Sequence, residues 1–140
     1  MIPEYVSALR RAVGPDHLLW LSGVVAVVRD GNGQVLLQRR SAGGPWTPPS
    51  GIVEPGEEPA AAVVREVAEE TGVRVLVERL AQVGTSPQVR HGNGDLAQYL
   101  ELVFACRPTG PGLRRRVGGG RLVRAGRPAA DERADAGDGG

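Results

Sequence analysis

The chain has 140 residues, and its sequence predicts one small α/β domain in which a helix packs on a mixed sheet. Short apolar runs rich in valine and leucine alternate with turns of glycine, proline and aspartate, which is typical of strands. One longer stretch of good helix formers lies between them, and its apolar residues recur at helical spacing. A helix packed on a sheet is the simplest assembly of these elements, because each must bury one apolar face.

The predicted elements follow one another without an internal repeat. Residues 14–16 end the first helix, and residues 30–33 form a hairpin turn between the first two strands. Residues 85–95 are rich in glycine, proline and polar side chains and predict a loop. In chain order the elements are a helix at 3–13, strands at 23–29 and 34–39, a helix at 60–70, and strands at 73–77, 80–83 and 97–106.

The helix at residues 60–70 has clear signals at both ends. Pro59 suits the first helical turn, because its missing N–H would have no partner there. Gly72 follows the last turn, where a left-handed cap residue is favoured. At about 100° per residue, one arc of this helix is apolar and can face a core. That arc holds Ala60, Val63, Val64, Val67 and Thr71.

Three glutamates crowd the neighbouring arc of the same helix. Glu66 and Glu70 are one turn apart, and Glu69 lies beside them. Their carboxylates repel one another, and Arg65 is the only cation nearby in the sequence. A hard divalent cation would relieve the repulsion, since Mg2+ favours carboxylate oxygens and keeps waters that a phosphate can displace. The alternative interpretation is a solvated acidic face that binds no ligand.

The stretch from residue 51 to residue 73 fits the spacing G-x5-E-x7-R-E-U-x-E-E-x-G-U, where U is aliphatic. It resembles the signature of the Nudix hydrolases, which cleave nucleoside diphosphates linked to another group with the help of divalent cations. The resemblance implies an α/β/α sandwich with a mixed sheet. It is specific for the family and not for the substrate. The nine matching positions are Gly51, Glu57, Arg65, Glu66, Val67, Glu69, Glu70, Gly72 and Val73.

The resemblance also implies roles for these residues. Mg2+ or Mn2+ would be bound by Glu66, Glu69 and Glu70 together with the carbonyl oxygen of Ser50, and the same glutamates would carry catalysis. Many relatives have a second glycine where this chain has Ser50, but only the backbone oxygen is needed. The structural positions of the motif are Gly51, Glu57, Arg65 and Gly72, with Glu57 and Arg65 bracing the loop against the helix.

Residues outside this motif are candidates for binding the substrate. Arg39 and Arg40 end the second strand beside the glycine loop, where relatives often place an arginine that contacts the nucleotide, and Arg40 is the closer match. His91 lies in the variable loop that often sets selectivity in this family. For these three residues the alternative is an ordinary exposed side chain. Weaker candidates, each with a structural alternative, are Trp46, Arg90, Asp95, Tyr99 and Glu101.

Composition limits the class of protein further. No apolar run approaches the roughly 20 residues that span a bilayer, and the N-terminus lacks the pattern of a signal peptide. Cys106 is the only cysteine, which excludes a disulfide framework, favours a core position and predicts a cytoplasmic protein. Residues 1–106 carry nine arginines against twelve acidic residues, so no surface for duplex nucleic acid is expected there. The expected partner is a small nucleotide, and the choice between monomer and homodimer stays open.

Residues 108–140 differ from the rest of the chain. They contain no aromatic residue, and nine of the 33 are glycine, which predicts a disordered tail behind a domain at residues 1–107. Relatives continue instead with an acidic segment, a tryptophan-containing strand and a final helix. A natural low-complexity tail and a shifted reading frame are the two open explanations. Two functions also stay open: a hydrolase, and a catalytically impaired module that binds a nucleotide.

Overall fold

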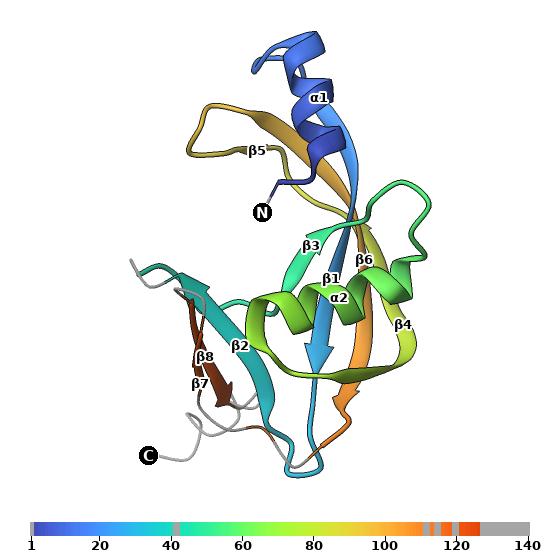
Figure 1. Cartoon of the computed structure of the whole chain (residues 1–140), viewed down its shortest axis with the longest axis vertical. Helices are drawn as coiled ribbons and strands as arrows, with labels where there is room; N and C mark the ends of the chain where they lie inside the picture. Colours follow the sequence, from blue (N-terminus) through green and yellow to red (C-terminus); the bar gives the residue numbers. More distant parts are fainter. Residues whose placement is uncertain (1, 41–42, 111–112, 114–115, 119–120, 127–140) are drawn as a thin grey trace, which may run out of the picture.

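A computed structural model describes residues 2–40, 43–110, 113, 116–118 and 121–126. It confirms the predicted α/β class, with a mixed sheet and packed helices (Figure 1). The elements in chain order are α1 (Glu4–Val13), β1 (Leu19–Val28), β2 (Val35–Arg40), β3 (Ser50–Ile52), α2 (Pro59–Thr71), β4 (Val75–Thr85), β5 (Val89–Arg90), β6 (Leu96–Pro108), β7 (Arg116–Gly118) and β8 (Arg121–Gly126).

The main sheet has the strand order β3-β1-β6-β4, and β5 pairs with β6 outside this path. At its centre β1 and β6 run parallel, in register from Leu19 opposite Ala97 to Val28 opposite Cys106. The outer strands β3 and β4 are antiparallel to their neighbours. The mixed sheet that the sequence predicts is therefore present, with its parallel pair in the middle.

The two helices pack against side chains that point to opposite sides of the central strands. Helix α1 packs through Val6 on Leu19, Leu21 and Ala97, near the start of β1 and β6. Helix α2 packs on the even-numbered positions of both strands, which point to the opposite side of each strand. The core under α2 contains Val24, Ala26, Val28, Leu36, Ala62, Val63, Val67, Val73, Val75, Phe104, Cys106 and Leu113. No helix among the described residues is long and apolar enough to cross a membrane.

Helix α2 begins and ends where the sequence predicts, with Pro59 in its first turn and Gly72 in the left-handed conformation at φ 74°. The predicted apolar arc is wrong at two positions. Ala60 and Val64 are exposed, and Ala62 is buried in their place. The helix is therefore rotated toward its acidic arc. The contacts of Glu66 with Gly51 and Arg65 favour this rotation.

Several strand boundaries also differ from the expectation. The two strands predicted at 73–77 and 80–83 are one strand, β4, with register irregularities between Val77 and Arg79 and between Leu80 and Gln82. Strand β1 begins at Leu19, because its outer half pairs with the start of β6. The turn at 30–33 is present, but beside it only Arg29 forms a bridge with Val35, and β1 and β2 join separate sheets.

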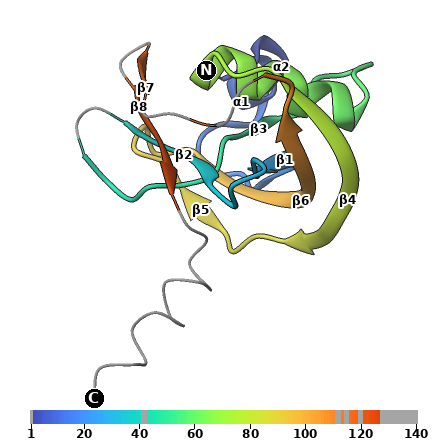
Figure 2. The same ribbon diagram turned by 90° about the horizontal axis from the view of Figure 1, so that it is seen from below.

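The second sheet has the order β2-β8-β7. Strand β8 pairs antiparallel with the whole of β2, from Val35 opposite Gly126 to Arg40 opposite Arg121. Figure 2 shows this small sheet and β4 on opposite sides of the β1–β6 pair. Strands β7 and β8 fall within residues 108–140, where the sequence predicts a disordered tail. Residues 127–140 lie outside the described residues, and the domain division at residue 107 stays a prediction.

The buried Asp30 connects the segment after β6 to the turn at residues 30–33. The Oδ1 atom of Asp30 accepts hydrogen bonds from the backbone N–H groups of Asn32 and Gln34, both at 2.9 Å. Its Oδ2 atom accepts one from the N–H of Leu113, also at 2.9 Å, and Leu113 is buried in the core. Burial raises the pKa of Asp30, but the three backbone hydrogen bonds outweigh burial and hold the pKa below its usual value.

The hydrogen bonds of Asp30 are expected to stabilise the fold. Asp30→Asn is expected to lower the free energy of unfolding at pH 7 by about 2 kcal/mol, the scale of hydrogen bonds to a charged group. Because the folded pKa is lowered, the stabilisation is present above the unfolded pKa of about 3.9 and is lost as pH falls through the folded pKa. Urea unfolding of both proteins between pH 3 and pH 7 should show a difference that closes in acid. Equal stability at pH 7 would contradict it.

Candidate active site

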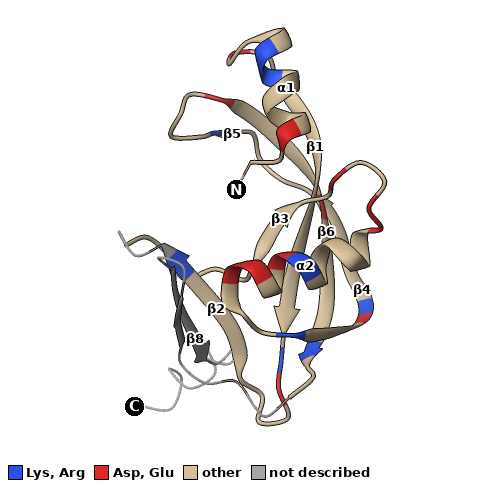
Figure 3. Ribbon diagram, in the orientation of Figure 1, with Lys and Arg blue, Asp and Glu red and all other residues tan. Residues whose placement is uncertain are grey.

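One cavity of about 610 Å³ extends from α2 and β3 to α1 and the loop between β5 and β6. This volume is in the range of sites that bind a small molecule. Its inner wall is formed by β2, β3, α2 and the loop between β2 and β3, and it carries Gln38, Arg39, Thr47, Ser50, Gly51, Glu66 and Glu70. Its outer wall is formed by α1, β6 and the loop between β5 and β6, and it carries Arg10, His91, Asn93, Asp95 and Tyr99. In Figure 3 the acidic positions of α2 lie along the helix and at its end nearest β2.

Glu66 reaches the cavity because the chain at Gly51 leaves room for it. A Cβ atom at Gly51 would lie 2.5 Å from Cγ of Glu66 and still closer to its carboxyl group. The backbone φ of Gly51 is not positive, so glycine is required here by close approach and not by conformation. The predicted structural role of Gly51 is thus explained by one contact between β3 and α2.

Arg65 ties the loop, the helix and Glu66 together. Its guanidinium donates to both carboxylate oxygens of Glu57, at 2.7 Å and 2.8 Å, and to Oε1 of Glu66 at 2.7 Å. A longer hydrogen bond of 3.3 Å reaches the carbonyl oxygen of Ile52. The Arg65 guanidinium lowers the pKa of Glu57, although burial opposes this effect. The predicted brace between Glu57 and Arg65 is what these contacts form.

Glu66 and Glu70 have different partners although both line the cavity. Burial raises the pKa of Glu66, Arg65 opposes that shift, and the charges of Glu70 and Glu69 add to it. Glu70 accepts a hydrogen bond of 2.5 Å on Oε2 from the side-chain amide of Gln38. The partners of Glu66 thus include a cation, and those of Glu70 include a neutral donor.

The donors on the inner wall fit a hard divalent cation. Glu66 and Glu70 supply carboxylate oxygens, and Ser50 lines the cavity beside them. Such an oxygen donor set suits Mg2+ or Mn2+, which complete their coordination with water and phosphate oxygens. Glu69 is 58% exposed, pairs with Arg65 at 3.3 Å, and is not among the residues that line the cavity. Among the described residues, no three acidic, His or Cys side chains are gathered closely enough to hold a metal by themselves.

Of the two arginines predicted to bind substrate, Arg39 lines the cavity. Its guanidinium carbon lies 4.8 Å above the ring centre of Trp46, a cation–π contact that holds the side chain flat. Its Nε atom is buried without a hydrogen-bond partner among the described residues. Trp46 therefore serves as a platform for Arg39. The side chain of Arg40, the closer match to the family pattern, lies outside the described residues.

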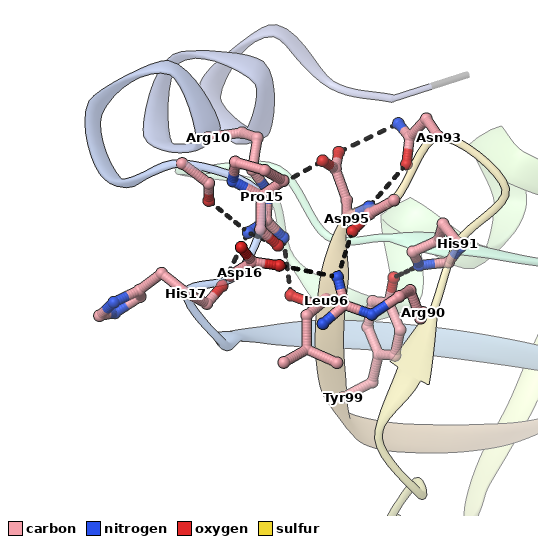
Figure 4. Close-up of polar contacts among 12 residues, drawn as sticks. Arg10, Pro15, Asp16, His17, Arg90, His91, Asn93, Asp95, Leu96 and Tyr99 are labelled. Carbon is pink, nitrogen blue, oxygen red and sulfur yellow. Dashed lines mark hydrogen bonds and ion pairs between the residues drawn. The ribbon is translucent and has the colours of Figure 1, made fainter.

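The outer wall is polar, and its side chains contact one another (Figure 4). His91 and Tyr99 share a hydrogen bond of 2.8 Å between Nε2 and the phenol oxygen. Asp95 lies 3.5 Å from Nε of Arg10, and it also accepts a hydrogen bond from Asn93. These side chains present donors and acceptors to a ligand, so the structure brings the predicted His91 to the same cavity as the glutamates.

Other candidates are not brought to the cavity. Arg90 donates to the carbonyl oxygen of Gly94 and pairs with Asp16, so it braces the loop. Glu101 lies in the middle of β6 opposite Gly23 and is not among the lining residues. Cys106 is 2% exposed in the core, where burial raises the pKa of its thiol to about 11. The core position predicted for Cys106 is confirmed.

Several lining residues are absent from the sequence-based set, among them Gln38 and Arg10. Gln38 sits one position before Arg39, in a strand whose alternation alone does not show which side faces a ligand. Arg10 lies in α1, far from the motif in the sequence, and donates to four backbone carbonyl oxygens, those of Gly14, Pro15, His17 and Leu96. Only the register between β1 and β6 brings α1 to this wall, and no local pattern predicts it.

Comparison with known proteins agrees with this architecture. A MutT-like protein of Streptomyces ambofaciens is 38% identical over 107 residues, which are 76% of this chain and 62% of that protein. The chain thus spans about three fifths of this curated relative. A solved UDP-X diphosphatase shares the fold, with a TM-score of 0.61 at 22% identity over 91% of this chain and 60% of that one.

A second solved structure is similar, the NUDIX hydrolase from Nitrosomonas europaea. It superposes with a TM-score of 0.57 at 29% identity over 84% of this chain and 77% of that one. The model of the NUDIX domain family matches residues 20–116, from β1 into β7. Because this match covers more than half of the chain and includes the motif at residues 51–73, the chain belongs to the Nudix hydrolase family.

Proposed function

We propose that this protein is a metal-dependent hydrolase that cleaves the pyrophosphate linkage of a nucleoside diphosphate derivative. The observation that carries the proposal is the cavity in which Glu66, Glu70 and Arg39 line one wall. Acidic side chains beside a guanidinium suit a polyphosphate whose charge is shared between a cation and an arginine. A neutral ester or a peptide has no phosphate charge to be shared in this way.

Each residue has a task in this proposal. A bound Mg2+ or Mn2+ would polarise a phosphate oxygen and lower the pKa of the attacking water. Glu66 and Glu70 would hold the cation with the carbonyl oxygen of Ser50, and Glu69 is the predicted third carboxylate. Arg39 would orient the phosphates through its forked donors, a role predicted for Arg40 as well.

The far end of the cavity would bind the rest of the substrate. His91 and Tyr99 supply polar atoms there, 2.8 Å from each other and on the wall opposite α2. The predicted substrate contact of His91 therefore concerns the nucleoside or the second group and not the phosphates. A reducing cytoplasm is the proposed compartment, since Cys106 is a free thiol. The oligomeric state stays open between monomer and homodimer.

A nucleotide-binding module without turnover is the second candidate. It rests on the departure of the segment after residue 107 from the pattern of relatives, whose acidic segment is absent from this sequence. Release of phosphate or nucleoside monophosphate, measured across nucleoside diphosphate derivatives with Mg2+ and with Mn2+, separates the two candidates. Hydrolysis of at least one derivative is expected. Tight metal-dependent binding without hydrolysis of any of them would favour the module.

Glu70→Gln supplies the direct test of the ligand role. The variant should lose at least about a hundredfold in metal-dependent kcat, more than the roughly 10–100-fold loss seen when only a neighbour of a ligand is changed. The fold should persist, because glutamine has nearly the same size as glutamate and Glu70 is only half-buried. Circular dichroism and the melting temperature check the fold. An undiminished kcat in a folded variant would show that Glu70 binds no cation.

A further inference from the structure

We propose that Gln38 is a positioning residue of this site, whose side-chain amide orients Glu70 for the cation. The inference rests on the proposed metal-dependent function. Its basis is the hydrogen bond of 2.5 Å from Nε2 of Gln38 to Oε2 of Glu70. This bond connects β2 to α2 across the cavity wall, between a residue outside the motif and one inside it.

Gln38 is held firmly enough to act as such a support. Its backbone N–H and carbonyl groups both pair with Thr47, at 2.8 Å each. On the other side it lies opposite Val123 in the β2–β8 ladder. Only 5% of its surface is exposed. A buried amide on a strand whose backbone is paired on both sides has little rotamer freedom, so its N–H group points to one place.

The choice of an amide matters chemically. Glu66 is paired with the charged guanidinium of Arg65 at 2.7 Å, which neutralises part of its negative charge. The amide of Gln38 carries no net charge, so it fixes Oε2 of Glu70 and weakens the attraction of that carboxylate for a cation less than a guanidinium would. Hydrogen-bonded neighbours of this kind orient metal ligands in many sites, and changing them lowers metal affinity about 10–100-fold. The expected effect of Gln38 is therefore on metal binding first.

The test measures Mn2+ binding to the full chain without any nucleotide. Gln38→Met has nearly the same volume, keeps the backbone pairing and lacks the donor. It is expected to raise the Kd for Mn2+ about tenfold, as measured from the paramagnetic resonance signal of free Mn2+. Gln38→Asn keeps the amide but withdraws it by one methylene, and it should weaken Mn2+ binding in the same direction. In turnover, both variants should lower kcat more than they raise KM.

A double-mutant cycle separates positioning from general disturbance. Glu70→Gln alone should weaken Mn2+ binding, and adding Gln38→Met to it should cause no further loss. Thr47→Val is the matched control, because Thr47 lines the same cavity and its hydroxyl lies as far as 3.5 Å from the carbonyl oxygen of Gln38. It should leave the Kd for Mn2+ unchanged. Melting temperatures without metal verify that each variant is folded.

The outcomes point in different directions. Parent-like Mn2+ affinity in folded Gln38→Met, with a clear loss in Glu70→Gln, would overturn the role of Gln38 and leave the proposed function intact. An equal loss on adding Gln38→Met to Glu70→Gln would also overturn it, since the effect would then not pass through Glu70. Unchanged affinity in Glu70→Gln would overturn both this inference and the ligand role on which it rests.

Discussion

Gly51→Ala is expected to reduce kcat/KM by at least about a hundredfold while the protein stays folded. The added Cβ would lie 2.5 Å from Cγ of Glu66 and closer to its carboxyl group, so either the glutamate or strand β3 must move. Displacements of about 1 Å at a reacting centre cost about this much in rate. Overpacking should also lower the free energy of unfolding by about 1–3 kcal/mol. Steady-state kinetics and urea unfolding measure the two effects.

Gly23→Ala is the matched control for this substitution. Gly23 lies opposite Ile52, next to Gly51 in the same sheet, and its backbone φ is not positive either. A Cβ there would meet its nearest atoms, in Gly51 and Tyr99, at an ordinary 3.7 Å. Its kcat/KM should stay close to that of the parent. Similar kinetics for the two alanine variants would show that the position of Glu66 against β3 does not matter for the reaction.

Arg65→Met is expected to lower the free energy of unfolding by about 3 kcal/mol at pH 7. The substitution removes the partner of Glu57 and Glu66, whose side chains are only 17% and 13% exposed. Buried carboxylates that lose their partner are costly. The side chain of Arg65 itself is 26% exposed. Solvent therefore screens part of each pair, and the loss stays near the lower end of that for buried pairs.

The pH dependence of this loss has a definite sign. Arg65 lowers the folded pKa of Glu57. The part of the stabilisation that comes from the Glu57 pair is therefore complete above the unfolded pKa of about 4.3 and disappears as pH falls through the folded value. Arg11→Met is the control, because the side chains of Arg11 and its partner Glu4 are 67% and 83% exposed. That pair should contribute less than about 1 kcal/mol. Equal losses in the two variants at pH 7 would contradict the bracing role of Arg65.

Local signals in the sequence suffice for the elements that depend on local physics. Pro59 and Gly72 define the ends of α2, because a missing N–H and a left-handed conformation are properties of single residues. The face of α2 is a different matter. The arc with Ala60 and Val64 is apolar, but the helix buries Ala62 because Glu66 must lie against Gly51. The contact of Glu66 with β3 favours this rotation of the helix, and the spacing of apolar residues within the helix cannot predict that contact.

The same division holds for the site and for the end of the chain. Spacing alone predicts that Glu66 and Glu70 share one side of a helix, and the structure places both in one cavity. Gln38 and Arg10 join them only through pairing between distant segments, which no pattern around either residue shows. Composition after residue 107 predicts no core, yet Leu113 is buried through a backbone bond to Asp30. The position of a single helix can thus be predicted from its own residues. The residues that contact it depend on how distant strands pair.

The parallel pairing of β1 with β6 also bears on how the protein is made. Residue 19 pairs with residue 97, so the centre of the sheet joins segments that are distant in the sequence. At about 5–20 residues per second of synthesis, β1 waits on the order of ten seconds before β6 exists. During that interval the apolar run of β1 can pair only with β3, at residues 23–25, and the rest of its ladder has no partner. Contacts of such high sequence separation slow folding, so the nascent chain is expected to depend on protection by chaperones until residue 106 has left the ribosome.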